Sequence, residues 1–374
     1  MIKIVADNKI PFLKGVLEPY AQVRYYPGKE ITPDKVRDAD ALIVRTRTHC
    51  DANLLEGSNV RFIATATIGF DHIDTEYCRQ NNIQWTNAPG CNSGSVMQYI
   101  ASALVFLSEK YGFDYKNITL GVVGVGNVGS KVVNLADALG MKVLMNDPPR
   151  ERKEGKNAFV PLETILRKAD IITFHVPLNH DGTDKTYHLA DDAFFDKLHH
   201  DAIIINSSRG EVVDNKALKN ALKTRKVKAA VLDVWENEPR LDPELLDLVD
   251  IGTPHIAGYS VDGKAMGTAM SVQAVSRFFG FDLDRWFPSG LPAPANTIIK
   301  LEGENLSSRE IINQAIRATY DIEEDDKRLR SSPETFEQQR GDYPVRREFG
   351  AFQLILNNVP QKTQQTLKKI GFNI

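Results

Sequence analysis

The stretch Gly124-Val125-Gly126-Asn127-Val128-Gly129 decides how the middle of this chain folds. It follows an apolar run at 118–123 that is typical of a buried parallel strand. Residues 130–139 come next, and their apolar side chains recur at helical spacing. A second strand at 142–145 leads to Asp147. Strand, glycine turn, helix, strand and acid in this order predict a βαβ unit that binds a dinucleotide.

Each part of this unit has a physical reason. The first glycine allows a tight turn, the second lets the backbone approach a pyrophosphate, and the third lets the helix pack close to the strand. The backbone N–H groups of Asn127 and Val128 lie at the start of the helix, where unpaired donors and the helix dipole attract phosphate. Asp147 is placed to accept hydrogen bonds from the adenosine ribose and would repel a 2′-phosphate. We therefore expect NAD as the cofactor, and not NADP.

The composition limits the classes of function. The chain has 374 residues, 25% of them charged, with a net charge of −3. This balance gives no electrostatic reason to expect nucleic acid or an anionic membrane as a partner. No apolar run is long enough to cross a bilayer, and the N-terminus does not resemble a signal peptide. Three cysteines without C-x-x-C spacing predict free thiols in a reducing cytoplasm and no metal site.

The first 93 residues alternate apolar runs with helical patterns, which predicts a small parallel α/β domain. The expected strands are 2–6, 22–25, 41–44 and 61–65, and the expected helices are 12–17, 33–37 and 75–81. Two polar loops, 45–48 and 65–69, follow strands, where ligands bind in such sheets. Anion binding and ordinary solvated turns are equally consistent with these loops.

The remaining chain continues the alternation. A long helix is expected at 95–109, and a polar loop at 150–157 follows two prolines. Further strands are expected at 169–174, 202–205, 229–232 and 251–253, with helices at 164–168, 191–198, 216–223 and 263–279. Each of these strands runs into a polar motif, so the motifs should meet at one edge of the sheet. In the tail we expect strands at 297–301 and 352–356 and helices at 307–320 and 361–370.

Four ordered motifs make residues 1–285 similar to the D-isomer-specific 2-hydroxyacid dehydrogenase family. They are the glycine turn with Asp147, Asn206-Ser207-Ser208-Arg209-Gly210, Asp233-Val234-Trp235 through Glu238-Pro239, and Thr253-Pro254-His255-Ile256-Ala257-Gly258. The resemblance implies a Rossmann-type NAD-binding domain at 94–256 and a flavodoxin-like parallel α/β substrate (lid) domain at 1–93 plus 257–286. It further implies a small α+β C-terminal dimerisation domain at 287–374, and hence a homodimer.

The chemistry of a 2-hydroxy acid oxidation assigns three roles. A carboxylate clamp suits Arg209, because a guanidinium binds carboxylates bidentately and stays charged. A base for the hydroxyl proton suits His255, and Glu238 would hold its ring in orientation. The competing interpretations are a surface ion pair for Arg209 and a solvated turn acid for Glu238. His175 also ends a strand and is the rival base, although its surroundings resemble the family's cofactor-lining loop.

The resemblance also implies which other residues touch the ligands. Cofactor contacts are expected from the glycine turn, Asp147, Val176, Ser207, Ser208, Arg209, Asp233 and Gly258. Substrate contacts are expected from Thr46, Thr67 and Tyr259. Arg45 and Arg346, each followed by a further arginine nearby, are candidates for binding a substrate phosphate, although arginines of this kind often only solvate the surface.

Together these features predict an NAD-dependent dehydrogenase that acts on a small phosphorylated 2-hydroxy acid. Two alternatives stay open at this stage. One is another member of the family, such as a D-3-phosphoglycerate dehydrogenase, although the tail lacks the βαββαβ pattern of a regulatory domain. The other is a non-catalytic NAD-binding regulator built on the same fold.

Overall fold

The computed structural model describes residues 1–199 and 201–374, and these divide into two compact units. The first unit consists of residues 1–92 and 260–292, and the second of residues 93–259 and 293–374. The first unit is therefore discontinuous, because the long helix α11 (Val261–Phe279) returns to it after the second sheet is complete. The predicted functional division into three domains stays a prediction.

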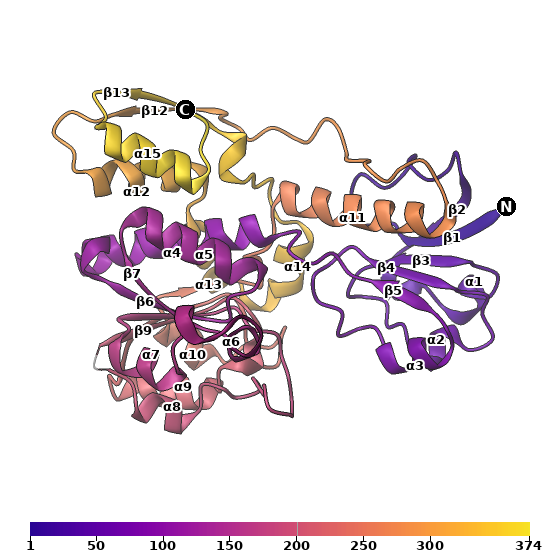
Figure 1. The fold of residues 1–374 in the computed structure, drawn as a ribbon, viewed down its shortest axis with the longest axis horizontal. Helices are drawn as coiled ribbons and strands as arrows, with labels where there is room; N and C mark the ends of the chain where they lie inside the picture. The colour runs from indigo at the N-terminus through magenta and orange to yellow at the C-terminus, as the bar shows by residue number, and fades with distance from the viewer. Residues whose placement is uncertain (200) are drawn as a thin grey trace. The chain divides into compact units, whose positions relative to one another are not determined.

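The first unit is built on a five-stranded parallel sheet of order β2-β1-β3-β4-β5. Helix α11 covers one face, where Val272 and Val275 pack on Ile4 and Ala6 (Figure 1). Three short helices cover the other face. This order is the flavodoxin-like one, as predicted. The elements are β1 (Ile2–Asp7), β2 (Ala21–Tyr26), α1 (Pro33–Val36), β3 (Ala41–Val44), α2 (Ala52–Leu55), β4 (Phe62–Thr65), α3 (Thr75–Gln80) and β5 (Gln84–Thr86).

One helix expected in this unit is wrong. Residues 12–17 form turns, in which Phe12 and Gly15 have left-handed φ angles of 63° and 88°. The apolar side chains there still enter the core, since Leu13 and Leu17 are fully buried. Their spacing therefore reflects burial beneath the sheet and not a helical backbone.

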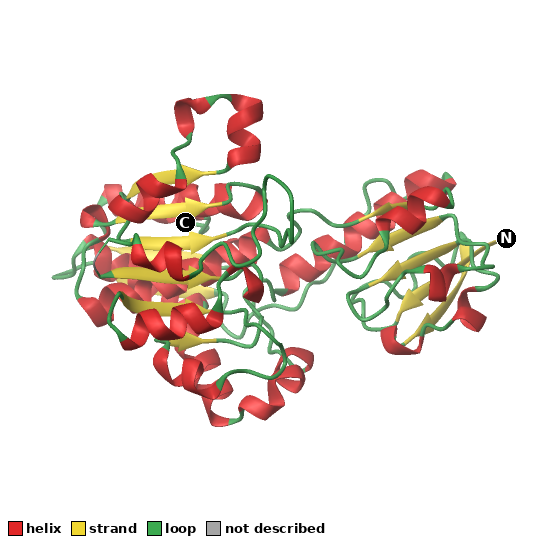
Figure 2. Ribbon diagram, turned by 90° about the horizontal axis from the view of Figure 1, so that it is seen from below, coloured by secondary structure: helices red, strands yellow, loops and turns green. Residues whose placement is uncertain are grey.

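The second unit is built on a six-stranded parallel sheet of order β11-β10-β9-β8-β6-β7. The strand order reverses at β6, which lies between β7 and β8, and ligands bind at such a switch point. Helices flank the sheet on both faces (Figure 2). The strands are β6 (Thr119–Val123), β7 (Lys142–Asn146), β8 (Ile171–Phe174), β9 (Ala202–Asn206), β10 (Val227–Leu232) and β11 (Ile251–Gly252).

The helices of this sheet largely follow the predicted pattern. They are α4 (Ser93–Tyr111), α5 (Asn127–Leu139), α6 (Pro148–Glu154), α7 (Leu162–Lys168), α8 (Asp192–Asp196), α9 (Asn215–Lys223) and α10 (Pro243–Leu248). The loop expected at 150–157 is largely wrong, because α6 occupies most of it. Asp147 caps this helix and the two prolines fill its first turn, where a missing N–H costs nothing.

The C-terminal segment is part of the second unit and shares the core of its six-stranded sheet. Residues of α12 and α15 belong to the same hydrophobic cluster as α4, α5 and the sheet. Figure 1 shows α12 and α15 against α4 and α5, with the parallel pair β12–β13 beyond them. The elements are β12 (Ile298–Glu302), α12 (Ser308–Thr319), α13 (Ile322–Ser331), α14 (Phe336–Gly341), β13 (Gln353–Asn357) and α15 (Gln361–Ile370). The capping box of Ser307 and Glu310 is confirmed.

His72 makes the stability of the first unit depend on pH. Its ring is 6% exposed and bonds the Thr65 hydroxyl at 3.0 Å. Burial lowers the pKa of His72 from 6.5 to about 4. Between these values the unfolded chain binds more protons than the folded one, so the free energy of unfolding falls as the pH drops from 6.5 to about 4.

We expect His72→Gln to lose less stability than the wild type across this window, by up to roughly 2–3 kcal/mol. Urea unfolding followed by circular dichroism at several pH values measures the difference. His180→Gln, at an exposed histidine of the second unit, is the matched control. Parallel pH dependences in the wild type and His72→Gln would contradict this assignment.

Candidate active site

The glycine turn has the geometry that a pyrophosphate requires. Gly124 has a φ of 86°, and a Cβ there would lie 2.6 Å from the His175 carbonyl oxygen. A Cβ on Gly129 would lie 2.0 Å from the carbonyl oxygen of Gly124, so α5 can pack this close only with glycine. Around Gly126, in contrast, no atom lies within 4 Å of a Cβ position. The turn is therefore tight on the protein side and open at the N-terminus of α5, where phosphate binds.

Asp147 lies beside this turn at the end of β7. Its Oδ2 accepts from the backbone N–H of Val125 at 2.8 Å, and its Oδ1 from that of Arg150 at 3.0 Å. Because a carboxylate has about four acceptor sites, these two bonds orient the group and leave capacity for ribose hydroxyls. The Arg150 guanidinium in turn donates to the Val125 carbonyl oxygen at 2.5 Å, a contact that the sequence did not suggest.

The loop that follows β9 is built around Asn206. Its amide oxygen accepts from the Ser208 hydroxyl at 2.9 Å, and its amide nitrogen donates to the Arg209 carbonyl oxygen at 2.9 Å. The half-buried Arg209 side chain donates to the Ser208 carbonyl oxygen at 2.8 Å. The buried Ser207 hydroxyl has no hydrogen-bond partner among the described residues. Such an orphaned polar atom suits a loop that lines a bound cofactor.

His255 and Glu238 form the pair that the sequence predicted. The Nδ1 of His255 lies 2.8 Å from Oε2 of Glu238, and Oε1 of Glu238 accepts from the Trp235 backbone N–H at 3.0 Å. Burial raises the pKa of Glu238, but His255 and these hydrogen bonds outweigh it, so the net shift is downwards and the carboxylate stays ionised. Since Nδ1 faces the carboxylate, Nε2 is the nitrogen left to exchange a proton with a ligand.

His175, the rival base, has a different environment. Its Nε2 lies 3.0 Å from the Thr173 hydroxyl, and burial lowers its pKa to about 3. Its carbonyl faces Gly124, and the side chain of Val176 lies against the same glycine. This segment therefore supports the glycine turn, and a ring with so low a pKa is a poor proton acceptor near neutral pH.

Asp233 anchors the loop that carries His255. It is 1% exposed, and its Oδ1 accepts from the Thr253 hydroxyl and the Ile256 N–H, both at 2.7 Å. Its Oδ2 accepts from the Ala257 N–H at 2.9 Å. Burial raises the pKa of Asp233 despite these bonds. A hydrogen bond to nicotinamide, as predicted, would come in addition to this anchoring role, which the sequence did not indicate.

Two candidate substrate-binding residues of the first unit, Arg45 and Thr67, have hydrogen-bond partners within that unit. The guanidinium of Arg45 binds the fully buried carboxylate of Asp7 through Nε at 3.0 Å and Nη2 at 3.2 Å. The Thr67 hydroxyl donates to the Gly69 carbonyl oxygen at 2.9 Å, whereas Thr46 is exposed. In the second unit, Tyr259 packs edge-on against Tyr343. Their contacts with substrate stay predictions.

Arg346 has a different position from the one expected for a phosphate ligand. It is 4% exposed, and its guanidinium donates to backbone carbonyl oxygens of the second unit. Charge patterning could not distinguish this buried arginine from a solvated one. We therefore do not retain Arg346 as a phosphate ligand.

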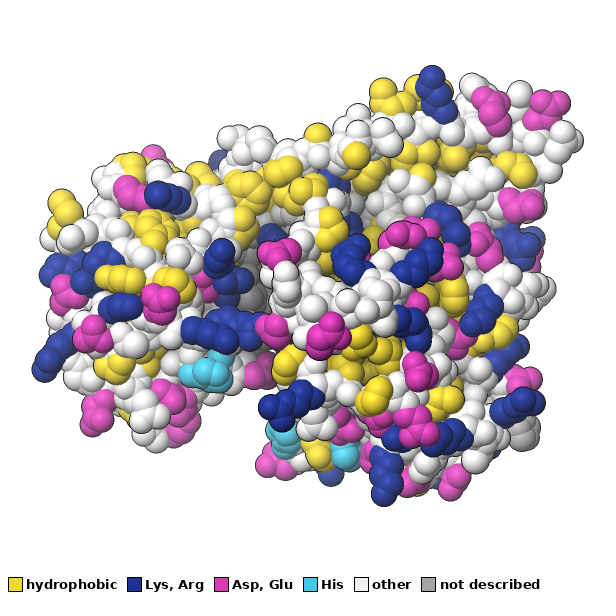
Figure 3. Space-filling model, turned by 180° about the vertical axis from the view of Figure 1, so that it is seen from behind, with side chains coloured by type: hydrophobic (Ala, Val, Ile, Leu, Met, Phe, Trp, Pro, Cys, Tyr) yellow, Lys and Arg dark blue, Asp and Glu magenta, His cyan; other side chains and the backbone are white. Residues whose placement is uncertain are grey.

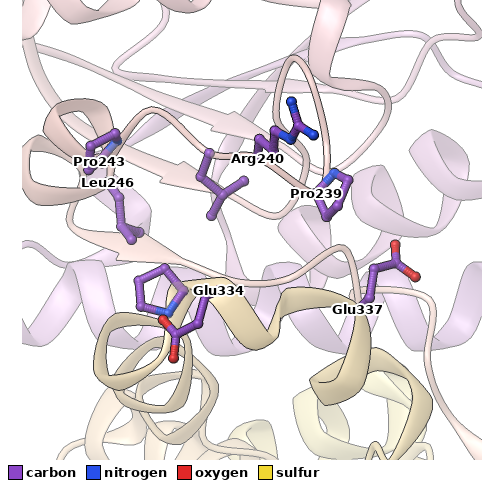
Figure 4. A pocket seen from close by; sticks show the side chains of 8 residues that line it. Pro239, Arg240, Pro243, Leu246, Glu334 and Glu337 are labelled. Carbon is purple, nitrogen blue, oxygen red and sulfur yellow. The ribbon is translucent and has the colours of Figure 1, made fainter.

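A cavity of about 370 Å³ adjoins the site without containing its chemistry (Figure 4). It lies between the segment after Glu238 and the segment that leads into α14, and it is lined by Pro239, Arg240, Leu241, Pro243, Leu246, Pro333, Glu334 and Glu337. Two glutamates beside one arginine do not favour an anionic ligand. On the face seen in Figure 3, Lys and Arg alternate with Asp and Glu, in agreement with the near-neutral composition. Among the described residues, no helix could span a bilayer.

Comparison with known proteins places this geometry in a family. Residues 102–257 match the family model described as D-isomer specific 2-hydroxyacid dehydrogenase, NAD binding domain. A protein of Bacteroides fragilis named erythronate-4-phosphate dehydrogenase is 53% identical over 357 residues, which cover 95% of this chain and 99% of the relative. One of the same name from Proteus mirabilis is 42% identical and covers the whole chain. The chain belongs to the erythronate-4-phosphate dehydrogenase family.

The matched NAD-binding region contains the glycine turn, Arg209, Glu238 and His255. NAD is therefore the cofactor of this dehydrogenase, in agreement with the open backbone at Gly126 and the orphaned Ser207 hydroxyl. A solved D-lactate dehydrogenase of Aquifex aeolicus, complexed with NAD and lactic acid, is 26% identical with a TM-score of 0.62. It covers 78% of this chain and is itself covered completely. Residues 291–371 match a domain of unknown function, DUF3410, so the family model assigns that segment no role.

Asp147→Asn should weaken NAD binding while it keeps α6 capped, since asparagine is also a good N-cap. Loss of a charged hydrogen bond of about 1.5–3 kcal/mol predicts a KM for NAD roughly 10- to 100-fold higher. The ratio of kcat/KM for NADP to that for NAD should rise as well. Steady-state kinetics with both cofactors measures this, and Asp137→Asn at the exposed side of α5 is the control. An unchanged cofactor ratio in Asp147→Asn would refute the ribose contact.

Proposed function

We propose that the chain oxidises 4-phospho-D-erythronate to (R)-3-hydroxy-2-oxo-4-phosphooxybutanoate with NAD⁺, a step of pyridoxal 5′-phosphate synthesis. The observation that carries the proposal is the His255–Glu238 pair, at 2.8 Å, at the carboxyl edge of the NAD-binding sheet. The relatives that bear the name erythronate-4-phosphate dehydrogenase align over 95% or more of this chain, which supports the specific substrate.

The reaction removes a hydride from C2 and a proton from the hydroxyl on C2. NAD⁺ supplies the hydride acceptor when bound. Nε2 of His255 takes the hydroxyl proton, while Glu238 holds the ring through Nδ1 and stabilises the imidazolium that forms. The Arg209 guanidinium binds the substrate carboxylate and holds C2 in place. The products are the 2-oxo acid, NADH and the proton that His255 later releases to water.

The first unit contributes the remaining substrate contacts in this proposal, through Thr46, Thr67 and Arg45. Arg45 is the phosphate candidate, because its bond to the buried Asp7 fixes the guanidinium at the end of a strand. Tyr259 is the proposed contact from the second unit.

A homodimer and a cytoplasmic location are also part of the proposal. Strands β12 and β13 bury alternate residues and leave Ile298 and Ile355 54% and 40% exposed. Two exposed isoleucines on the outer face of a two-stranded sheet, beside the polar Lys300, Glu302, Gln353 and Asn357, suit pairing with a second copy of the chain. Cys50, Cys78 and Cys91 form no disulfide among the described residues, which supports a reducing compartment.

The dimer is tested by Ile298→Lys combined with Ile355→Lys, because lysines cannot be buried in an apolar interface. Sedimentation of the wild type should give twice the mass of one chain, and the double variant should sediment as a monomer. Met266→Lys, which changes an equally exposed apolar residue on α11, should leave the mass unchanged. A monomeric wild type contradicts the proposal.

The reaction is tested by NADH formation from purified protein, NAD⁺ and 4-phosphoerythronate. His255→Asn should lower kcat by roughly 10²- to 10⁴-fold, the usual contribution of a general base. Glu238→Gln should lower kcat, because the ring of His255 loses the charged partner that holds Nδ1 in place.

Glu236→Gln provides a matched control, since Glu236 also pairs with a histidine, His188, at 2.7 Å. It should change kcat/KM by less than about threefold, as expected for a change outside the chemistry. Absence of NADH formation with 4-phosphoerythronate would refute the proposed substrate. An unchanged kcat in Glu238→Gln would refute the role of that carboxylate.

A further inference from the structure

The backbone is strained at His255 itself, and hydrogen bonds hold the next two residues, Ile256 and Ala257, in place. His255 has a φ of 56°, in the left-handed region that side chains rarely adopt. Such a conformation is strained and persists only where the surroundings enforce it. The carboxylate of Asp233 supplies one constraint, because it accepts the N–H groups of Ile256 and Ala257.

Arg346 supplies the opposite constraint on the same two residues. Its Nη2 donates to the Ala257 carbonyl oxygen at 2.5 Å, and its Nη1 lies 3.5 Å from that of Ile256. The same guanidinium reaches the Ser95 carbonyl oxygen at the start of α4, at 3.1 Å. A buried anion thus binds the amides of Ile256 and Ala257, and a buried cation binds their carbonyls.

The C-terminal segment is built to keep this cation in place. The guanidinium carbon of Arg346 lies 4.4 Å from the ring centre of Tyr320 and 6.0 Å from that of Tyr343. Both tyrosine hydroxyls donate to Oδ2 of Asp325, at 2.8 and 2.6 Å. Two aromatic faces and a nearby carboxylate therefore offset the cost of removing this charge from water.

A second contact fixes the backbone on which Arg346 lies. Oε1 of Glu348 accepts from the Ser95 hydroxyl at 2.8 Å, in the first turn of α4. The Arg347 carbonyl oxygen accepts from the side chain of Gln98, one turn further along, at 2.9 Å. Arg346 is thus tied to a helix of the NAD-binding core on one side and to the His255 loop on the other.

We propose that Arg346 is a positioning residue for His255, so that the C-terminal segment, which the family model leaves without a role, completes the scaffold of the active site. Arg346 touches neither substrate nor cofactor in this proposal. It fixes the two peptide groups that follow His255, so that the ring stays aligned with Glu238. The inference rests on the proposed function for its kinetic test but not for its structural test.

The kinetic test uses Arg346→Lys and Arg346→Met in the full chain. Lysine keeps the charge but cannot reach three carbonyl oxygens with one planar fork. We expect kcat with 4-phosphoerythronate to fall at least about tenfold in Arg346→Lys and further in Arg346→Met, as a mispositioned base predicts. The KM for NAD should change less than about threefold, since the glycine turn is untouched.

Arg309→Met is the matched control, because Arg309 is another arginine of the C-terminal segment that donates to a carbonyl oxygen of the second unit, that of Phe113. It should lower the melting temperature without lowering kcat. Unchanged kcat in both Arg346 variants overturns the inference. The inference is also overturned if weaker NAD binding and a lower melting temperature account for the whole fall in kcat, which is what a purely structural role predicts.

The structural test needs no turnover. The imidazole NMR signals of His255, assigned with His255→Asn, should shift in both Arg346 variants and stay unchanged in Arg309→Met. Unshifted signals in Arg346→Met overturn the inference even if the enzyme is active. If the wild type does not oxidise 4-phosphoerythronate but the signals shift, the proposed substrate fails and the positioning role stands.

Discussion

The buried carboxylate of Asp233 is the interaction on which the site depends. It lies just after β10 and binds the Thr253 hydroxyl and two amides beyond His255. Through these bonds one side chain at the end of β10 fixes the loop that follows β11 and carries His255. Because the group is 1% exposed and the Ala257 N–H is the donor to Oδ2, loss of that bond would leave a buried oxygen unpaired. The loop therefore has a single low-energy arrangement, and the ring of His255 inherits its orientation from it.

The sheet explains why cofactor and base meet at one edge. All six strands are parallel, so their carboxyl ends lie together, and the order reverses at β6. The glycine turn leaves β6 at this switch point, and the Arg209 and His255 loops leave β9 and β11 along the same edge. In the proposed mechanism the hydride acceptor, the Arg209 clamp and the His255 base act on one carbon, although Gly124 and His255 are 131 positions apart in the chain.

The C-terminal segment also supports this arrangement, through a shared core and through one buried arginine. It shares the core of the NAD-binding sheet through α12 and α15. It also carries a buried cation, Arg346, to the carbonyls of the His255 loop. Its apolar side chains on α12 and α15 are buried against those of α4 and α5, so the segment and the NAD-binding sheet stabilise each other. The same packing brings an arginine near the chemistry, which supports a role beyond association.

Much of the fold and of the candidate site followed from the sequence alone, because local patterns encode local structure. The glycine spacing, the strand periodicity and the motifs at strand ends predicted the second sheet, the first sheet without its edge strand β5, and the His255–Glu238 pair. Features that depend on distant contacts did not follow. The sequence could not tell that residues 12–17 lie in turns, that Asp233 anchors a loop, or that Arg346 is buried. A side chain's burial and partners depend on segments far away in the chain, and only tertiary packing brings Arg346 within 2.5 Å of the Ala257 carbonyl oxygen.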